Sequence, residues 1–548
     1  MCRSTGFARH SGRPRFAFLP TQRMKTTIIL LITLATLDLG SPTELQAAKR
    51  PNIIFLLTDD QRDNTFGAMG HPWVKTPNVD RLLSQSVRFR NTYIAEPVCS
   101  PSRVSLLTGM HERVHGVGFT SSYQLTEAQW ERTYPALLKK DGYYTGFVGK
   151  FGVEYYSFKG NADKKFDFWW GHDGWTRFLP KTFQAPSTEP YQNATADIIT
   201  PIMGEAMAKF LTTIPDDKPF CLSVSFNTPH GSQTTSMHAE YADWRKMTRP
   251  ANENLALQGT RFYDTLYRDL DIQIPAATGT DPYRFMPKFI QNQDKGRKTQ
   301  TYQYSYTRPT CTEHHIRYYQ TISGLDHAIG GLLKELKQRG LDDNTVIIYG
   351  SDHGLLMGEY GMGGKALLYD LASKIPCFVH DPRIAKSKKG RQLDELVSSL
   401  DITRTILDYA DVEAPDFMTG RSLRPLVEGN KVKWRKHLFL ESLYTGRDTP
   451  FQEGVRMGKW KYVRMFDGVG NYKEDDVDFD GREPEFEMLF DLDADPGETN
   501  NLIKAHADAK VLTTLRRHTA TGSRDLNQKR KQFIATVATE ARSSRKKK

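Results

Sequence analysis

Four short apolar runs, separated by segments of helical periodicity, limit the folds that are open to this chain. They span residues 52–58, 145–148, 220–226 and 345–349. Continuous apolar runs of this length are typical of strands that are buried on both faces of a parallel sheet. The clearest helical pattern lies in 325–336, where leucine and isoleucine recur on one face, and Gly340 closes it. The alternation predicts an α/β fold with a mainly parallel sheet flanked by helices.

Each of the four runs ends at charged or ionisable side chains. The ends carry Asp59 and Asp60, Lys150, His230, and Asp352 and His353. In open parallel sheets, ligands bind outside the carboxyl ends of the strands. Four separate loops would therefore bring chemical groups to one edge of one sheet, which packing alone does not explain.

The paired acids Asp59 and Asp60 would repel each other unless a cation neutralises them. Asp352 and His353 could complete a ring of ligands around such a cation. Carboxylate oxygens suit Ca²⁺ or Mg²⁺, whereas the softer His353 would also allow Mn²⁺ or Zn²⁺. The alternative is structural: the two acids could cap a helix after their strand, and Asp352-His353 could form a polar turn.

The sequence Cys-Ser-Pro-Ser-Arg at 99–103 predicts the start of a helix. Ser100 is a good N-cap, Pro101 suits a first helical turn, and Gly109 can end the helix. Cys99 would then lie just before a helix N-terminus, where backbone N–H groups favour an anion. Arg103 would add a permanent cation one turn further on. A cysteine at this place is an activated thiolate, a group made from a thiol, or a half-buried side chain at an ordinary turn.

This stretch, followed by Leu-Thr-Gly at 107–109, resembles the signature of the type I sulfatases. In that family a maturation enzyme oxidises the cysteine to formylglycine, whose hydrated aldehyde is the nucleophile. The resemblance implies an alkaline-phosphatase-like fold, a formylglycine at Cys99, and a divalent cation. The implied ligands of that cation are residue 99, Asp59, Asp60, Asp352 and His353. The resemblance favours Ca²⁺ over Mg²⁺ or Mn²⁺, because sulfatases place Asn or His at the fourth position.

Further side chains match catalytic and substrate-binding residues of the family. Lys150 and Lys365 match two sulfate-binding lysines, and Lys365 follows two glycines much as in sulfatases. His230 matches the acid that protonates the leaving group, a task that suits an imidazole with a pKa near the working pH. Arg103 belongs to the signature itself. The alternatives are lysines on solvated loops and a histidine with a structural role.

The chain departs from the family at one position. Sulfatases usually have Gly-Lys-x-His after the second strand, whereas this chain has Gly-Lys-Phe-Gly at 149–152. Gly152 therefore replaces the histidine that assists collapse of the aldehyde hydrate. His111 or His115, shortly after the signature helix, could take its place.

The N-terminus has the features of a secretory leader. Met24-Lys25 precedes an apolar run at 28–37 and a zone of small and polar residues up to Ala48. The run is too short to span a bilayer comfortably. We therefore predict export with cleavage near Ala48, to a secreted or periplasmic location without a stable membrane anchor. A retained N-terminal anchor is the alternative.

The predicted leader, residues 1–48, is followed by a catalytic domain over 49–430 and a smaller C-terminal subdomain over 431–548. Alternating residues at 454–463 and an apolar run at 488–492 predict antiparallel strands in this subdomain, similar to the C-terminal part of sulfatases. The chain ends in a basic tail, which we expect to be disordered from Arg542 on.

Two segments could contact a substrate sugar. Residues 236–313 form a long polar and aromatic stretch, which predicts an insertion over the active-site face that carries specificity. Residues 168–175 contain three tryptophans. Their rings could stack on a sugar, although packing in the core is the commoner role of tryptophan.

The net charge of +11 would attract polyanions. A sulfated polysaccharide fits that charge, and no recognised nucleic-acid-binding motif accompanies it. The chain has five cysteines without the spacing of a disulfide framework. Cys221, Cys311 and Cys377 are therefore expected to be mostly free or buried thiols, with room for one disulfide.

Together these features predict an exported sulfatase that hydrolyses sulfate esters of a carbohydrate or polysaccharide. The expected partners are the sulfated carbohydrate and the formylglycine-generating maturation enzyme, and not nucleic acid. One alternative is a phosphonate monoester or phosphodiester hydrolase with the same metal and nucleophile. The other is a non-catalytic protein whose Cys99 is never oxidised and whose basic face binds polyanions.

Overall fold

The computed structural model describes much of the chain between Arg50 and Lys546. The described residues are 50–119, 121, 125–153, 161–172, 191, 193–196, 198–230, 266–278, 308–446, 449–468, 470–507 and 509–546. The predicted leader at 1–48 and most of the predicted insertion at 236–313 lie outside them, as does Trp175. Within the described residues, no helix has both the length and the hydropathy that crossing a membrane requires.

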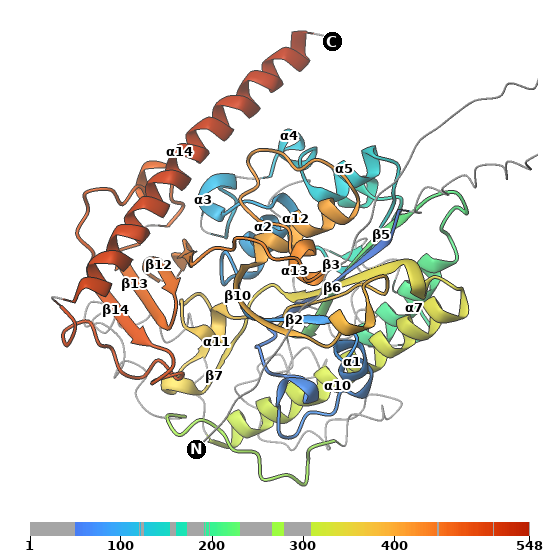
Figure 1. The fold of residues 1–548 in the computed structure, drawn as a ribbon, viewed down its shortest axis with the longest axis horizontal. Coiled ribbons are helices and arrows are strands. Elements are labelled where there is room, and N and C mark those ends of the chain that lie inside the picture. The colour runs from blue at the N-terminus through green and yellow to red at the C-terminus, as the bar shows by residue number, and fades with distance from the viewer. Residues whose placement is uncertain are drawn as a thin grey trace, which may run out of the picture. The chain divides into compact units, whose positions relative to one another are not determined.

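An eight-stranded, mainly parallel sheet forms the centre of the fold (Figure 1). Its strands, in spatial order, are β10 (Gln392–Ser398), β2 (Val87–Tyr93), β9 (Phe378–His380), β6 (Thr345–Ser351), β1 (Asn52–Asp59), β5 (Phe220–Pro229), β3 (Tyr144–Lys150) and β4 (Phe168–His172). Of these strands, β9 alone runs antiparallel to its neighbours. The four apolar runs form β6, β1, β5 and β3, which are adjacent and parallel. The predicted α/β fold is therefore confirmed.

Alternate residues of β1 face two different hydrophobic cores. Ile54 and Leu56 belong to one core, and Ile53, Phe55 and Leu57 belong to the other. Because successive side chains of a strand point to opposite faces, a strand that is buried throughout must be covered on both sides. The covering helices are α1 (Pro77–Leu83), α7 (Ile199–Leu211) and α10 (Arg308–Gln338) on one face, and α2 (Cys99–Thr108), α5 (Tyr134–Lys140) and α12 (Ser399–Tyr409) on the other (Figure 1).

Helix α10 is longer than the sequence pattern indicated. The predicted face at 325–336 lies within it, and Gly340 follows it with a left-handed φ of 63°. The helix begins at Arg308, so residues 308–313 are helical and do not belong to the predicted insertion.

The described tryptophans at the end of the sheet pack against neighbouring side chains. The Trp169 ring stacks on the ring of Phe147, with centroids 5.1 Å apart and an interplanar angle of 20°. The Lys209 ammonium lies 5.4 Å from the centroid of the Trp170 ring. Trp169 therefore has the packing role that the sequence left as the commoner alternative.

The C-terminal part contains a second, antiparallel sheet of four strands, as predicted. These strands are β11 (His437–Ser442), β12 (Phe451–Met457), β13 (Trp460–Phe466) and β14 (Phe486–Asp491). Helix α14 (Lys510–Lys546) lies beside this sheet (Figure 1), and its Leu512 and Leu515 share a core with Val455. The helix continues past Arg542 to Lys546, where we expected a disordered tail. Buried leucines at helical spacing begin this helix, which the charge pattern of the tail did not reveal.

Short elements connect these layers. A two-stranded ribbon is formed by β7 (Leu356–Met357) and β8 (Gly363–Gly364). The short α-helices are α3 (Glu112–His115), α4 (Glu127–Trp130), α11 (Asp370–Ser373) and α13 (Arg424–Val427). Described 3-10 helices span Gly67–Met69, Ala162–Lys165, Asp342–Asn344, Glu359–Gly361, Lys386–Lys388 and Asp475–Val477.

Candidate metal centre and active site

Helix α2 begins at Cys99, earlier than the sequence predicted. Val98 precedes it in an extended conformation (φ −142°, ψ 139°), and Cys99 is the first helical residue. Ser100, which we expected to cap the helix, instead donates its hydroxyl to the carbonyl of Gly152 at 2.6 Å. The cap prediction is wrong because the helix begins before Ser100, which lies within its first turn, while Val98 occupies the N-cap position. Gly109 ends the helix with a left-handed φ of 67°, as predicted.

Two backbone hydrogen bonds join the loops at the carboxyl edge of the large sheet. The N–H of Asp352 donates to the Thr58 carbonyl at 2.9 Å, and the N–H of His230 donates to the Asp59 carbonyl at 2.9 Å. The loops that follow β6 and β5 are thus fixed on either side of the end of β1. This is the arrangement that adjacent parallel strands allow, and it brings the charged strand ends together.

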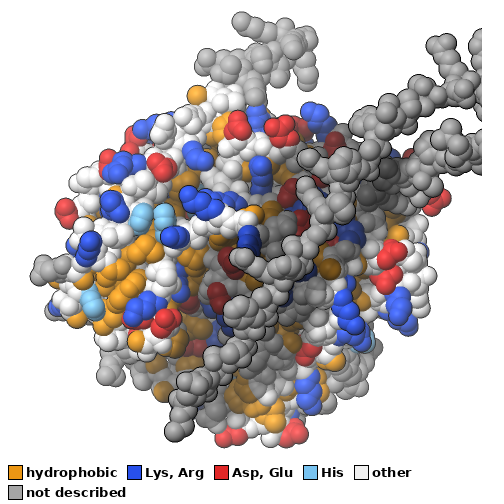
Figure 2. Space-filling model, in the orientation of Figure 1, with side chains coloured by type: hydrophobic (Ala, Val, Ile, Leu, Met, Phe, Trp, Pro, Cys, Tyr) orange, Lys and Arg blue, Asp and Glu red, His pale blue; other side chains and the backbone are white. Residues whose placement is uncertain are grey.

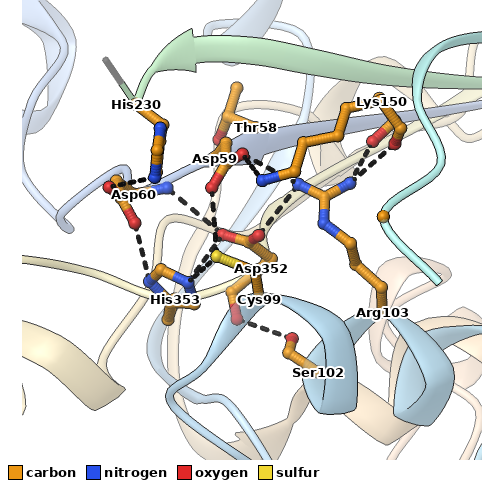
Figure 3. Close-up of polar contacts among 12 residues, drawn as sticks. Thr58, Asp59, Asp60, Cys99, Ser102, Arg103, Lys150, His230, Asp352 and His353 are labelled. Atoms are coloured by element: carbon orange, nitrogen blue, oxygen red, sulfur yellow. Dashed lines mark hydrogen bonds and ion pairs between the residues drawn. The ribbon is translucent and has the colours of Figure 1, made fainter. Parts of the chain in front are cut away.

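The side chains from these loops and from α2 converge at one place (Figure 3). Two overlapping groups of ligand atoms each lie within 4.8 Å of one another: Asp59, Cys99, Asp352 and His353, and Asp59, Asp60, Cys99 and His230. The Cys99 thiol points at Asp59 Oδ1, 3.7 Å away, and His353 Nε2 lies 3.2 Å from Cys99 Sγ. All five predicted metal ligands are therefore close together, and all are buried.

Arg103 connects the acids of this cluster to helix α2. Its Nη2 lies 2.8 Å from Asp352 Oδ2 and 3.3 Å from Asp59 Oδ2. Its Nη1 donates to the carbonyl of Lys150 at 2.9 Å and also contacts the hydroxyl of Ser225. Because the guanidinium is planar and buried, it fixes the two carboxylates relative to the helix and to the end of β3.

The two predicted sulfate-binding lysines reach into the same cluster. Lys150 Nζ lies 2.5 Å from Asp59 Oδ2. Lys365 Nζ lies 2.7 Å from Asp60 Oδ1 and 2.7 Å from Cys99 Sγ. Both side chains are buried, so neither belongs to a solvated loop.

The pKa values of the two paired acids shift in opposite directions. Burial alone would raise the pKa of Asp59, but Lys150, His230 and Arg103 outweigh it and hold that pKa well below its usual range. Burial also raises the pKa of Asp60. The nearby Lys365 offsets only part of this rise, and the pKa of Asp60 is about 7. Asp60 Oδ2 is buried without a hydrogen-bond partner. An orphaned carboxylate oxygen beside further buried oxygens fits a hard divalent cation, which would keep Asp60 ionised.

The turn that carries Asp60 is supported from α10. Asp60 has a left-handed φ of 66°, which is uncommon for a residue with a side chain. Its carbonyl accepts the hydroxyl of Tyr318 at 2.8 Å, and that hydroxyl accepts the N–H of Arg62 at 2.9 Å. Helix α10 thereby holds the turn that presents Asp60 to the cluster.

His230 lies at the outer side of the cluster, and its side chain is 19% exposed. Its Nε2 lies 3.7 Å from Asp60 Oδ2. Burial, helped by the nearby Lys365 and Lys150, lowers the pKa of His230 well below its usual value although Asp59 opposes the shift. Burial first, and the two ammonium groups second, thus favour the neutral imidazole in the absence of a substrate.

Gly152 has a physical reason to lack a side chain. Its φ is 77°, and a Cβ built on it would lie 2.6 Å from Cδ of Arg103. The two histidines considered as substitutes lie elsewhere: His111 Nδ1 is 3.5 Å from Glu441, and His115 Nε2 is 3.0 Å from the Ser105 hydroxyl. Neither histidine belongs to the groups of ligand atoms around Cys99.

Several buried residues near the cluster were not identified from the sequence. The hydroxyl of Ser102 donates to the Asp352 carbonyl at 2.6 Å. His172 pairs in register with Lys150, and its Nε2 lies 3.1 Å from Asn227 Oδ1. His172 and Asn227 lie at the ends of β4 and β5, so the strand-end rule could have found them. We had read the segment of His172 only as a possible source of stacking rings.

Comparisons with known proteins agree with this arrangement. A family model described as Sulfatase matches residues 51–412, and one described as N-sulphoglucosamine sulphohydrolase, C-terminal, matches residues 358–525. An arylsulfatase of Clostridium perfringens is 26% identical over 85% of this chain and 93% of its own length. An N-acetylglucosamine-6-O-sulfatase of Bacteroides thetaiotaomicron is 26% identical over 86% of each chain. The solved phosphonate monoester hydrolase of Agrobacterium radiobacter shares the fold, with a TM-score of 0.62 and 21% identity over 88% of this chain and 96% of its own.

Proposed function

The chain belongs to the sulfatase family, the type I sulfatases of the alkaline phosphatase superfamily, and we propose that it is an exported enzyme that hydrolyses sulfate esters of a carbohydrate. The observation that carries this proposal is the convergence of buried acids from separate loops on Cys99, together with two ammonium groups and a guanidinium. Such a site is built to hold a cation and an anionic group side by side.

We assign the nucleophile to residue 99 after its oxidation to formylglycine. Burial raises the pKa of the Cys99 thiol, which Lys150 and Lys365 offset only in part. A protonated thiol is a weak nucleophile, so the unmodified cysteine is not suited to attack. The Cys99 sulfur thus marks the position that the oxygens of the aldehyde hydrate would occupy.

The donors around residue 99 fit a divalent cation, for which we propose Ca²⁺ rather than Mg²⁺ or Mn²⁺. Asp59, Asp60, Asp352 and His353 would hold it together with residue 99, and the buried Asp60 Oδ2 has no hydrogen-bond partner that would compete with the cation. When bound, the cation would lower the pKa of a hydroxyl of the hydrated formylglycine, and that hydroxyl would supply the nucleophile for the sulfate ester.

The chain's own residues then bind and orient the substrate. Lys150 and Lys365 would balance the charge of the sulfate oxygens, since their ammonium groups already lie among the ligands. Arg103 would keep Asp59 and Asp352 in place during the reaction. His230 would give a proton to the leaving alcohol, because the negative sulfate beside it favours the protonated imidazole.

We propose a sulfated carbohydrate as the substrate class. The N-acetylglucosamine-6-O-sulfatase among the relatives supports it, as does the net charge of +11. We further propose the maturation enzyme as a partner, no nucleic-acid partner, and export through the leader at 1–48 to a secreted or periplasmic location without a stable membrane anchor. The proposed catalytic domain spans 49–430 and the C-terminal subdomain 431–548.

The test is a screen of sulfated oligosaccharides with protein that is co-expressed with the maturation enzyme. We expect the wild type to release sulfate and Cys99→Ala to release none. Cys221→Ala is the matched control, because Cys221 is also buried but lies within β5, with a pKa that burial raises to about 12. Sulfate release that survives Cys99→Ala in full would contradict the mechanism.

One alternative function has a specific observation in its favour. The phosphonate monoester hydrolase of Agrobacterium radiobacter shares the fold. Comparing kcat/KM on an aryl sulfate with that on an aryl phosphonate and an aryl phosphate diester separates the two activities. A clear preference for the sulfate is expected, and a preference for either phosphorus ester would replace the proposal.

The non-catalytic reading has less support. Figure 2 shows acidic and basic side chains interspersed on the visible face, without one continuous basic patch. An unmodified thiol at Cys99 in natively matured protein would favour this reading, whereas an aldehyde would exclude it.

A further inference from the structure

The antiparallel C-terminal sheet reaches the loop that carries Lys365. Strands β11 and β12 place Ser442 and Gln452 opposite each other in register. Both side chains are fully buried, and both lie against the carbonyl of Ala366: Gln452 Nε2 donates to it, and the Ser442 hydroxyl is within hydrogen-bond distance of it. The distances are 3.0 Å from the Ser442 hydroxyl and 2.8 Å from Gln452 Nε2. Two buried polar side chains of the C-terminal sheet are thus directed at one carbonyl of the loop that carries Lys365.

Ala366 has an unusual backbone, and its neighbours hold it there. Its φ is 68°, in the left-handed region that disfavours residues with a Cβ. Its N–H donates to the Pro97 carbonyl at 3.1 Å, which ties it to the turn before Cys99. Gln452 also accepts the N–H of Leu368 at its Oε1, 3.1 Å away. The Gln452 amide therefore bridges the Ala366 carbonyl and the Leu368 N–H, two backbone groups at the strained residue and just after it.

The same pair of strands also holds the other side of the site. Glu96, three residues before Cys99, accepts the N–H of Leu443 at 2.9 Å, and its Oε1 lies 3.0 Å from the Ser442 hydroxyl, whose single proton serves either Glu96 or the Ala366 carbonyl. Ser442 thus lies between the turn that leads to residue 99 and the turn that follows Lys365. The relative position of Lys365 Nζ and residue 99, now 2.7 Å from nitrogen to sulfur, depends on both turns.

We propose that Gln452, with Ser442 beside it, is a positioning residue for catalysis. It touches neither the acids nor residue 99, and acts by fixing the Ala366 carbonyl so that the Lys365 ammonium faces the transferring sulfate. The C-terminal sheet is then part of the catalytic apparatus. This inference rests on the role of Lys365 in the proposed function.

The test compares two substitutions that each remove an amide bridging backbone groups in or beside the C-terminal sheet. Gln452→Met removes the bridge beside Lys365. Asn501→Leu is the matched control, because the Asn501 amide also bridges backbone groups: it accepts the N–H of Leu489 at 3.0 Å and that of Ile503 at 3.1 Å, and it donates to the Glu487 carbonyl at 3.0 Å. The bridge of Asn501 lies on β14, whereas Gln452 contacts the Lys365 loop.

We expect Gln452→Met to lower kcat for sulfate ester hydrolysis about ten- to a hundredfold with little change in KM, and Asn501→Leu to leave kcat within about twofold. Ser442→Ala removes the hydroxyl beside the Ala366 carbonyl and leaves Gln452 in place, so it should lower kcat less than Gln452→Met. If Gln452→Met does not fold, Ser442→Ala is the variant that tests the inference. The double variant Lys365→Ala/Gln452→Met should have nearly the same kcat as Lys365→Ala alone, because Gln452 acts through Lys365.

A Gln452→Met variant with wild-type kcat overturns the inference. The inference is also overturned if Asn501→Leu lowers kcat as much as Gln452→Met does. The same holds if Gln452→Met lowers kcat by its full factor in the Lys365→Ala background. Failure of the proposed function is seen separately, as a Lys365→Ala variant that keeps full activity or a mature wild type that hydrolyses no sulfate ester.

Discussion

Replacing Gly152 by alanine tests the geometry around Arg103. The left-handed φ of 77° at Gly152 would cost a residue with a Cβ about 1–2 kcal/mol. The added Cβ would also lie 2.6 Å from Cδ of Arg103, whose guanidinium is held by Asp352, Asp59 and the Lys150 carbonyl. Arg103 would have to leave these partners, and breaking a buried ion pair costs roughly 3–5 kcal/mol.

Gly142→Ala separates the two contributions. Gly142 has a φ of 93°, and a Cβ there would meet nothing within 4 Å. Both variants carry the backbone cost, but only Gly152→Ala displaces Arg103. We expect Gly152→Ala to lower the free energy of unfolding by about 3 kcal/mol more than Gly142→Ala, measured by urea titration.

The same displacement should lower activity. A misplaced Arg103 would release Asp59 and Asp352, so kcat/KM should fall about a hundredfold in Gly152→Ala and change little in Gly142→Ala. A histidine at 152 should do no better than alanine, because it has the same Cβ. The reasoning is refuted if Gly152→Ala is as stable as Gly142→Ala and keeps the wild-type rate.

Three further predictions concern charge. Arg103→Lys should lower kcat/KM about a hundredfold with the fold retained by circular dichroism, because one ammonium cannot reach Asp352 and the Lys150 carbonyl together; a rate within a few-fold of wild type would contradict this. Ca²⁺ at about a hundred times its Kd should stabilise the protein by about 2.7 kcal/mol and raise Tm, and EGTA should reverse the rise; an unchanged Tm would speak against the cation site. Burial raises the pKa of Glu112 to about 8. The folded state thus holds a proton that the unfolded state loses from about pH 4.5 upward, so stability should fall between about pH 4.5 and 8. Glu112→Gln should flatten this profile in urea titrations, and an equally steep profile would contradict it.

The sequence was informative where local pattern and strand topology coincide. Each apolar run had the length of a strand buried on both faces, and those four strands are neighbours in the sheet. Because parallel neighbours end at the same edge, residues as distant in sequence as Asp59 and Asp352 could be placed together without a structure. The resemblance added Lys365, which no strand-end pattern would have selected.

The remaining errors come from contacts between distant parts of the chain. Ser100 has the sequence of an N-cap, but its hydroxyl bonds to Gly152, which only the folded chain brings near. His111 follows the signature helix, yet it lies against Glu441, more than three hundred residues away in the chain. The pKa of His230 depends on how deeply it is buried beside Lys150 and Lys365, which composition and spacing do not encode.

The most direct test of the account is a crystal structure of the matured protein grown with Ca²⁺, with an anomalous difference map. We predict one peak at about 2.3–2.6 Å from oxygens of Asp59, Asp60 and Asp352, beside a residue 99 whose density has lost its sulfur. A map in which residue 99 keeps its sulfur and no cation lies among these acids would contradict the account.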